Sequence, residues 1–167
     1  MKKNEVFMRN LRLAVFSLVL VVSTSLTLGR LSIAAQNRPE ENNFTMTIPA
    51  GGVCAFGVEI SGTGKTKTIV LPGDRLIMTS PGADVTLTNL DDPTKQVTLN
   101  ITGSFHVTTE QDGSVVTVST GRSLLGDPQA GFVLAIGNFS FVFDANGNLI
   151  QPLQGKGQLI DACAMID

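Results

Sequence analysis

The sequence predicts an all-β domain, an antiparallel β-sandwich or a small β-barrel of about ten short strands, preceded by a signal peptide. Short runs rich in Val, Ile, Leu, Thr and Phe recur along the chain, with Gly, Pro, Asn and Asp between them. No segment after the leader shows the apolar period that a helix needs. The N-terminus is basic and is followed by an apolar stretch. Two cysteines follow it, far apart in the sequence. These features together indicate an exported β protein tied by a disulfide.

Residues 1–35 are predicted to be the signal peptide. Four basic residues precede an apolar stretch from Leu13 to Leu28, and cleavage is expected after Ala34 or Ala35. Arg30, between the stretch and this site, is unusual in such a leader. The stretch has about 16 residues, five of them Ser or Thr, whereas a membrane span needs about 20 mostly apolar residues. We therefore expect a secreted, extracellular protein with no membrane span after cleavage; an uncleaved membrane anchor is the alternative.

Residues 36–50 are interpreted as a flexible arm, and residues 51–167 as a single β domain. The segment 36–43 contains no apolar side chain whose burial could offset the entropy of ordering. The chain after Ala35 has seven Lys and Arg against thirteen Asp and Glu, a formal charge of −6. A domain of that sign repels phosphate backbones, so nucleic acid is not an expected partner.

Cys54 and Cys163 are the only cysteines, and we predict a disulfide between them. In the chain-entropy model, closing a loop of about 110 residues stabilises a fold by about 4 to 5 kcal/mol. The bond would join the first predicted strand to the last. Two thiols without histidines at ligand spacing do not predict a metal site, and no cofactor is expected.

Turn residues separate the predicted strands and favour antiparallel hairpins. One of these turns, Asp112-Gly113, is predicted to be a two-residue hairpin loop, which places Val107 opposite Val118 and Gly103 opposite Arg122. The predicted strands are the segments 54–60, 66–71, 76–80, 85–90, 96–109, 114–120, 132–136, 139–144, 149–153 and 158–163.

Arg122 is the predicted ligand-binding residue, because this register points it into the apolar face, where Gly103 leaves space for a guanidinium. An unpaired, desolvated guanidinium costs several kcal/mol. A carboxylate such as Asp127 or Glu59, or an anionic ligand, is therefore expected to meet it. In the alternative, Gly121 forms a bulge that turns Arg122 out to solvent.

Other candidate motifs have simpler structural interpretations. His106, the only histidine, lies on the polar side of its predicted strand, and no nucleophile motif accompanies it. The segment 62–66 lacks the first glycine of a phosphate-binding loop and is expected to be a hairpin turn. Phe139, Phe141 and Phe143 alternate as a core stripe does. No catalytic residue is predicted.

Six stretches between Cys54 and Cys163 carry a family resemblance: 54–58, 97–103, 106–109, 120–128, 130–134 and 141–149. They resemble a group of small secreted bacterial β-rich proteins that have two cysteines and no established activity. The resemblance implies secretion and the two-cysteine frame, but it transfers no catalytic residue.

The expected function is a non-catalytic extracellular binding or structural domain. Its partner would be a small anionic ligand, a small apolar ligand or a protein surface. The alternative is a secreted β-barrel enzyme, an isomerase or a hydrolase, that uses Arg122 with a carboxylate. The geometry of the structure distinguishes these two functions, because an enzyme needs a cleft in which several polar groups converge and a structural domain does not.

Overall fold

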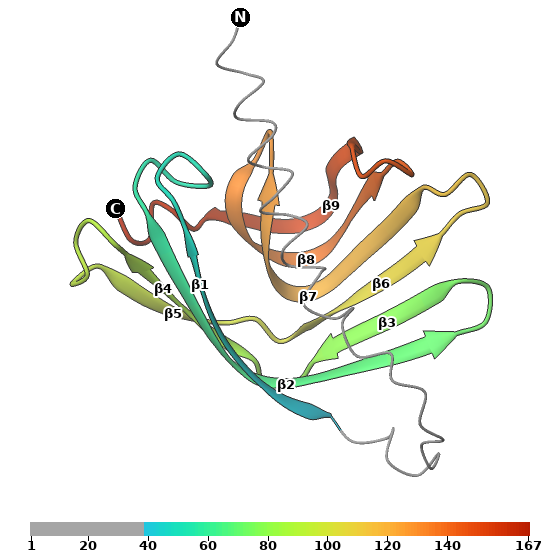
Figure 1. Cartoon of the computed structure of the whole chain (residues 1–167), viewed down its shortest axis with the longest axis horizontal. Coiled ribbons are helices and arrows are strands. Elements are labelled where there is room, and N and C mark those ends of the chain that lie inside the picture. The colour runs from blue at the N-terminus through green and yellow to red at the C-terminus, as the bar shows by residue number, and fades with distance from the viewer. Residues whose placement is uncertain (1–38) are drawn as a thin grey trace, which may run out of the picture.

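The computed structural model describes residues 39–167, so the predicted signal peptide and its cleavage site lie outside the described residues. The described chain is all-β, as predicted: nine strands form one antiparallel sheet (Figure 1). The sheet is not closed, since its first and last strands, β5 and β9, are not paired, so the barrel alternative is not observed. Residues 39–167 contain no helix that could span a membrane.

The strands follow the order β5-β4-β2-β3-β6-β7-β8-β9, and β1 pairs with β2 beside this path. Long, bent strands at both ends of the sequence give the sheet its curvature (Figure 1). The strands are β1 (Glu40–Ile48), β2 (Val58–Leu71), β3 (Arg75–Ser80), β4 (Asp84–Asn89), β5 (Gln96–Asn100), β6 (Gly103–Thr109), β7 (Val115–Asp127), β8 (Gly131–Phe143) and β9 (Leu149–Asp161).

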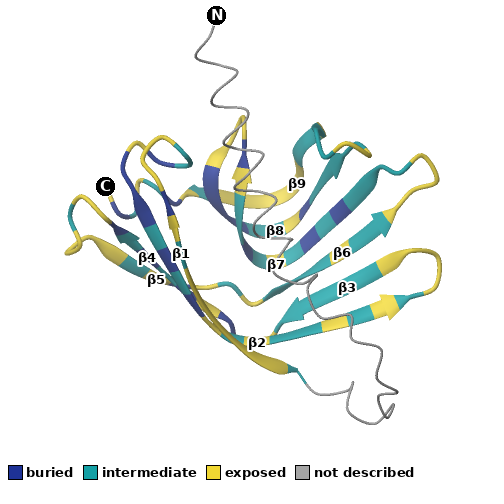
Figure 2. Ribbon diagram, in the orientation of Figure 1, coloured by how far each residue is buried: buried dark blue, intermediate teal, exposed yellow. Residues whose placement is uncertain are grey.

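One part of the sheet is folded over another, and we call this part the two-layer region. Its first layer is β1, the first half of β2, β4 and β5. Its second layer is residues 122–127 of β7, 131–136 of β8 and 158–161 of β9. Buried side chains from both layers make one hydrophobic core, seen as dark blue in Figure 2. The largest fully buried members are Leu87, Leu134, Ile166, Val58 and Val85.

A row of glycines forms a crease across four strands. Gly103, Gly121, Gly137 and Gly157 are register partners on β6, β7, β8 and β9. Gly121 has a φ of +89°, and a Cβ there would lie 2.8 Å from the carbonyl oxygen of Thr102. Only glycine fits such a close approach at positive φ.

The crease folds β7 sharply back on itself. Ser119 Oγ and Ser123 Oγ are 2.7 Å apart, a buried hydrogen bond across the inside of the bend. In a straight strand, two residues four positions apart would be separated by about 13 Å. One side of the crease packs on the core, and the other side extends away from it.

We call the part of the sheet beyond the crease the wing. It consists of residues 67–71 of β2, β3, 104–109 of β6, 115–119 of β7, 139–143 of β8 and 149–154 of β9. Figure 2 shows most of it in teal and yellow, the colours of half-buried and exposed residues, and its buried residues are Thr117, Ser119 and Phe139 near the crease. Away from the crease the wing is therefore a single layer, in contrast to the two-layer region.

The predicted disulfide is confirmed. Cys54 and Cys163 are bonded, with 5.6 Å between their Cα atoms and 109 positions between them in the sequence. The bond joins the loop before β2 to the segment after β9. A second tie lies nearby, where the buried Asn89 donates from Nδ2 to the Ile166 carbonyl at 3.0 Å. Both ties belong to the two-layer region.

The expectation of an unstructured arm at residues 36–50 is wrong for the described residues of that range. Glu40–Ile48 form β1, which pairs with β2 along its whole length. The polar composition misled the prediction, because backbone hydrogen bonds order this strand. In addition, Met46 and Ile48 turn their side chains toward the core. Residues 36–38 of the predicted arm lie outside the described residues.

Several predicted strand boundaries are also wrong. Each of three predicted pairs of strands is one continuous strand: 54–60 and 66–71 overlap β2, 132–136 and 139–144 overlap β8, and 149–153 and 158–163 overlap β9. Residues 54–57, 144 and 162–163 lie outside these strands. Glycines between the halves bend these strands rather than ending them. Conversely, the predicted strand 96–109 is two strands, because the chain changes layers at residues 101–102.

The predicted register of β6 and β7 is wrong by one residue. The hairpin loop has three residues, since Thr109 pairs with Val115 and Glu110 N donates to the Ser114 carbonyl at 2.8 Å. Gly113, with a φ of +81°, supplies the left-handed residue that such a loop requires. Val107 therefore faces Thr117, and Gly103 faces Gly121 in place of Arg122.

Candidate functional site

Arg122 follows the crease and occupies a different place from the one predicted. Its backbone N–H donates to the Thr102 carbonyl at 3.0 Å. Alternation along β7 places its side chain on the same face as Leu124, which packs against the core. The side chain is half-buried, and among residues 39–167 its Nε has no hydrogen-bond partner. Arg122 is thus neither on the face of Val107 nor turned freely into solvent.

Asp127 is buried at the end of β7, where it has a structural role. Its Oδ1 accepts hydrogen bonds from the backbone N–H groups of Gln129 and Ala130, both at 2.8 Å. Its Oδ2 accepts from the Leu153 N–H at 2.8 Å. The carboxylate therefore closes the β7–β8 turn and ties it to β9. Five positions from Arg122, it lies on the opposite face of the strand.

Glu59 lies on the outer side of the two-layer region. Its neighbours Val58 and Ile60 are buried in the core, so alternation turns Glu59 away from it. Glu59 pairs with Thr47 on one side and Thr88 on the other. The structure therefore does not bring the three predicted site residues together.

Other polar groups make no catalytic cluster in the part of the chain that the structure describes. No group of three or more His, Cys, Asp or Glu side chains there could hold a metal ion. His106 is exposed on β6, with Ser104 Oγ 3.5 Å from its Nε2. A surface hollow of about 340 Å³ is lined by Glu41, Asn43, Gly64, Lys65, Pro81 and Gly82, and it includes none of the predicted site residues.

The inner face of the wing is the larger candidate site, and we call it the trough. It lies inside the bend that the glycine crease makes, facing the second layer of the two-layer region. Register and alternation bring apolar side chains from β3, β6 and β8 onto this face in two rows, and β7 lies between β6 and β8. One row is Met78, Phe105 and Phe139, and the other is Leu76, Val107 and Phe141.

The trough carries no charge among the described residues of these strands. Polar members of the two rows are Ser119 and Thr117, which are uncharged. The cationic and titratable side chains Lys67, Arg75 and His106 alternate to the opposite face. A sheet face without charges has the composition of a protein interior.

Burial within the trough falls with distance from the crease. Phe139, beside the crease, is only 5% exposed, whereas Phe141 and Phe143 farther out are half-buried. Their rings form an edge-to-face pair with centroids 5.7 Å apart. Val70, at the outer margin on β2, is 76% exposed. The trough is therefore closed at the crease and open toward the end of the wing.

The free edges of the wing are protected against strand addition. On its unpaired edge, β9 carries Pro152 within the wing and Lys156 next to the crease, and the outer half of β2 carries Lys67 and ends before Pro72. Proline and lysine on edge strands hinder pairing with another chain. Any partner of the wing is therefore expected to contact its face.

Three hairpin loops, β2–β3, β6–β7 and β8–β9, lie at the far end of the wing and carry carboxylates. Hydrogen bonds from the Ser114 side chain and backbone lower the pKa of Asp112. In the third loop, hydrogen bonds from Asn148, chiefly its side chain, lower the pKa of Asp144. Both carboxylates are therefore ionised at neutral pH.

Comparison with known proteins finds no matching family model, no matching curated protein and no matching solved structure. The resemblance to small secreted bacterial proteins thus stays a prediction.

The trough is the site that sequence reasoning missed. The alternation of Phe139, Phe141 and Phe143 was visible and was interpreted as core packing. That interpretation is right for Phe139, which is buried, but the other two are only half-buried. Combining the apolar alternation of several strands with the correct register would have found the shared face; whether a second layer covers it is a tertiary property.

Proposed function

We propose that this protein is a non-catalytic extracellular binding domain that holds an apolar partner in the trough. The observation that carries the proposal is an uncharged apolar face on a single-layer sheet. A sheet with one apolar face normally buries it against a second layer. In the trough, Leu76, Met78, Phe105, Val107 and Phe141 are half-buried and Val70 at the margin is exposed. Contiguous apolar surface that reaches solvent is typical of interaction sites.

The energetics of the trough favour occupation. Each square ångström of apolar surface removed from water contributes about 25 cal/mol. A partner that covers the half-buried Leu76, Phe105, Val107 and Phe141 gains this free energy. The backbone need not reorganise, because the crease and the three hairpins already fix it. The site is preorganised, which lowers the cost of binding.

The disulfide supports the extracellular part of the proposal. Disulfides persist in oxidising compartments outside the cytosol. The bond stabilises the two-layer region, so the wing is carried by a covalently tied base. Arg122, Asp127 and Glu59 contribute no converging polar groups, which favours binding over catalysis.

The uncharged fluorescent dye Nile red tests the proposal on the purified protein. We expect saturable binding with increased emission. Val107→Asp places a charge inside the trough and should weaken this binding at least tenfold. Val118→Asp is the matched control, because Val118 is also half-buried in the wing but faces the other way, opposite His106. It should change the affinity less than twofold.

Circular dichroism and the melting temperature verify that each variant folds. Should Val107→Asp not fold, Val107→Thr keeps the side-chain shape and replaces one methyl group with a hydroxyl, and a smaller loss of dye binding is then expected. Absence of saturable dye binding, or equal loss in the Val107 and Val118 variants, would contradict the proposal.

A further inference from the structure

We infer that the partner in the trough is a short apolar peptide segment with basic residues at one end, and that this basic end lies at the acidic end of the wing. The inference rests on the proposed function and names the chemistry of its partner. It is carried by the combination of an uncharged trough with a concentration of carboxylates at the open end.

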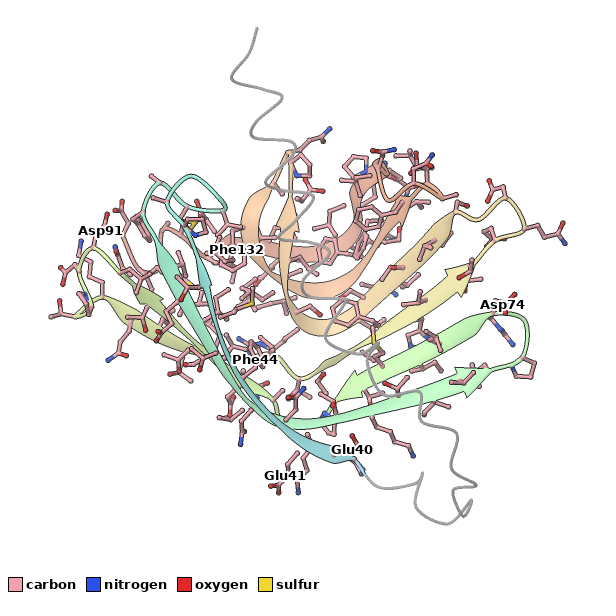
Figure 3. The ribbon with its side chains drawn as sticks, in the orientation of Figure 1. Glu40, Glu41, Phe44, Asp74, Asp91 and Phe132 are labelled. Carbon is pink, nitrogen blue, oxygen red and sulfur yellow. A yellow bond between two sulfur atoms is a disulfide. The ribbon has the colours of Figure 1, made fainter. Side chains whose placement is uncertain are left out.

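We call the three hairpin loops at the open end of the trough the acidic tip. They carry four carboxylates: Asp74, Glu110, Asp112 and Asp144. In these loops and the strand residues next to them, Arg75 is the only cation, and its Nε already donates to the Pro72 carbonyl at 3.1 Å. Figure 3 shows Asp74 at the end of the β2–β3 hairpin, far from Phe132 in the two-layer region.

The loops of the acidic tip lie side by side. Thr109 N donates to the Asp74 carbonyl at 3.0 Å, which joins the β2–β3 loop to β6. A Cβ built on Gly113 would lie 2.9 Å from the Cβ of Ala145, so the β6–β7 and β8–β9 loops also touch. The four carboxylates therefore produce a combined negative potential at the open end.

The dimensions of the trough suit a short segment. Phe139 and Phe143 are four positions apart on β8, about 13 Å along the strand. Four neighbouring strands, β3, β6, β7 and β8, span about 14 Å across the sheet. An extended segment of about four or five apolar residues covers this distance, and residues that follow it reach the acidic tip.

Charge distinguishes this partner from the other occupants. A second copy of the chain would bring another acidic tip and another domain of charge −6 to the same place. An anionic membrane surface would be repelled by the same carboxylates. An uncharged small molecule would fill the trough but would gain nothing from the acidic tip. A peptide with a basic end is attracted by the carboxylates of the acidic tip, and added salt screens this attraction.

Two fluorescently labelled peptides test the inference. Both contain the apolar segment Leu-Val-Phe-Leu-Val, preceded in one by three lysines and in the other by three glutamates. Fluorescence anisotropy at low salt should show at least tenfold tighter binding of the lysine peptide. Raising the salt to about 0.5 M, where the Debye length is only a few ångströms, should reduce this preference to less than threefold.

A double variant, Asp74→Asn with Glu110→Gln, removes two carboxylates from the acidic tip. Asn tolerates the left-handed φ of 51° at position 74, and the Glu110 side chain is exposed, so the loops keep their structure. We expect the preference for the lysine peptide to fall at least threefold. The control is Glu40→Gln with Glu41→Gln, which removes two carboxylates from β1, apart from the tip (Figure 3), and should leave the preference unchanged.

The outcomes separate the two proposals. Saturable dye binding, with equal affinity for both peptides, overturns the basic-ended partner and leaves the trough as a binding site. No binding of the dye or of either peptide overturns both. Tighter binding to anionic vesicles than to the lysine peptide, or a dimer in analytical ultracentrifugation that Val107→Asp dissociates, overturns the peptide partner in favour of a lipid surface or a second copy.

Discussion

The two-layer region and the wing share β2, β7, β8 and β9, yet the apolar faces of the two regions have different neighbours. In the two-layer region, Leu134 on β8 is 1% exposed because the opposite layer covers it. Nine positions further along the same strand, Phe143 is half-buried. The glycine crease separates the two environments. Alternation thus determines which face of a strand is apolar. The bend determines whether another layer of the same chain covers that face.

The largest expected effect concerns the covalent tie of the two-layer region. Replacing both cysteines, Cys54→Ser with Cys163→Ser, should lower the free energy of unfolding by about 4 to 5 kcal/mol, because the unfolded chain regains the entropy of a long loop. Urea denaturation measures the change. A loss below about 1 kcal/mol would show that the two ends of the domain are held chiefly by packing.

Matched leucine truncations compare the two regions directly. Leu134→Ala, in the core, should cost about 3 kcal/mol, since it leaves a cavity between two layers. Leu76→Ala, in the trough, should cost about 1 kcal/mol, because a half-buried side chain leaves no enclosed cavity. Urea denaturation of both variants provides the numbers. Equal costs would mean that the wing is packed as tightly as the core.

The crease itself can be tested at Gly121. Gly121→Ala should destabilise the protein by about 2 to 3 kcal/mol, because alanine is strained at a φ of +89° and its Cβ meets the Thr102 carbonyl. Gly126→Ala is the control, since a Cβ there meets nothing within 4 Å. Thermal unfolding compares the two variants. Equal melting temperatures would contradict the requirement for glycine in the crease.

The smallest expected effect is a pH dependence shared by the two regions. Hydrogen bonds lower the pKa of Asp112 and Asp144 in the wing, and hydrogen bonds from Thr94 lower the pKa of Asp92 in the β4–β5 loop. A lowered folded-state pKa contributes stability above the unfolded value of 3.8. This contribution is lost as the pH falls through the folded-state pKa.

Urea midpoints measured between about pH 5 and pH 2 should therefore decrease modestly. Ser114→Ala removes the largest cause of the Asp112 shift and should make the decrease smaller. A midpoint that rises on acidification would contradict this assignment.

Much of the two-layer region could be predicted from the sequence, because its determinants are local or covalent. Apolar alternation, turn residues and a pair of cysteines predicted an antiparallel β fold and the Cys54–Cys163 bond, and the structure has both. β1 was missed because its order comes from backbone pairing, which composition does not record. The strand ends were misplaced where glycine bends a strand instead of ending it.

The candidate site was less predictable, because it depends on a register and on a missing layer. One additional residue in the β6–β7 loop moved Arg122 to the other face and removed the basis for its pairing with Asp127 or Glu59. The trough requires four strands to be aligned and left uncovered. The apolar pattern of a single strand predicts the alignment only in part. It contains no information on whether a second layer covers the face.

The glycine row also implies an order of events as the chain folds. Gly103, Gly121, Gly137 and Gly157 lie on consecutive strands joined by hairpins, so the crease is built from contacts between sequence neighbours. The thiols are 109 positions apart. Since short loops close before long ones, we expect the β6–β9 hairpins to form first and sulfur oxidation to come last. Pulse-labelled amide exchange showing protection of β4 before β7 would reverse that sequence.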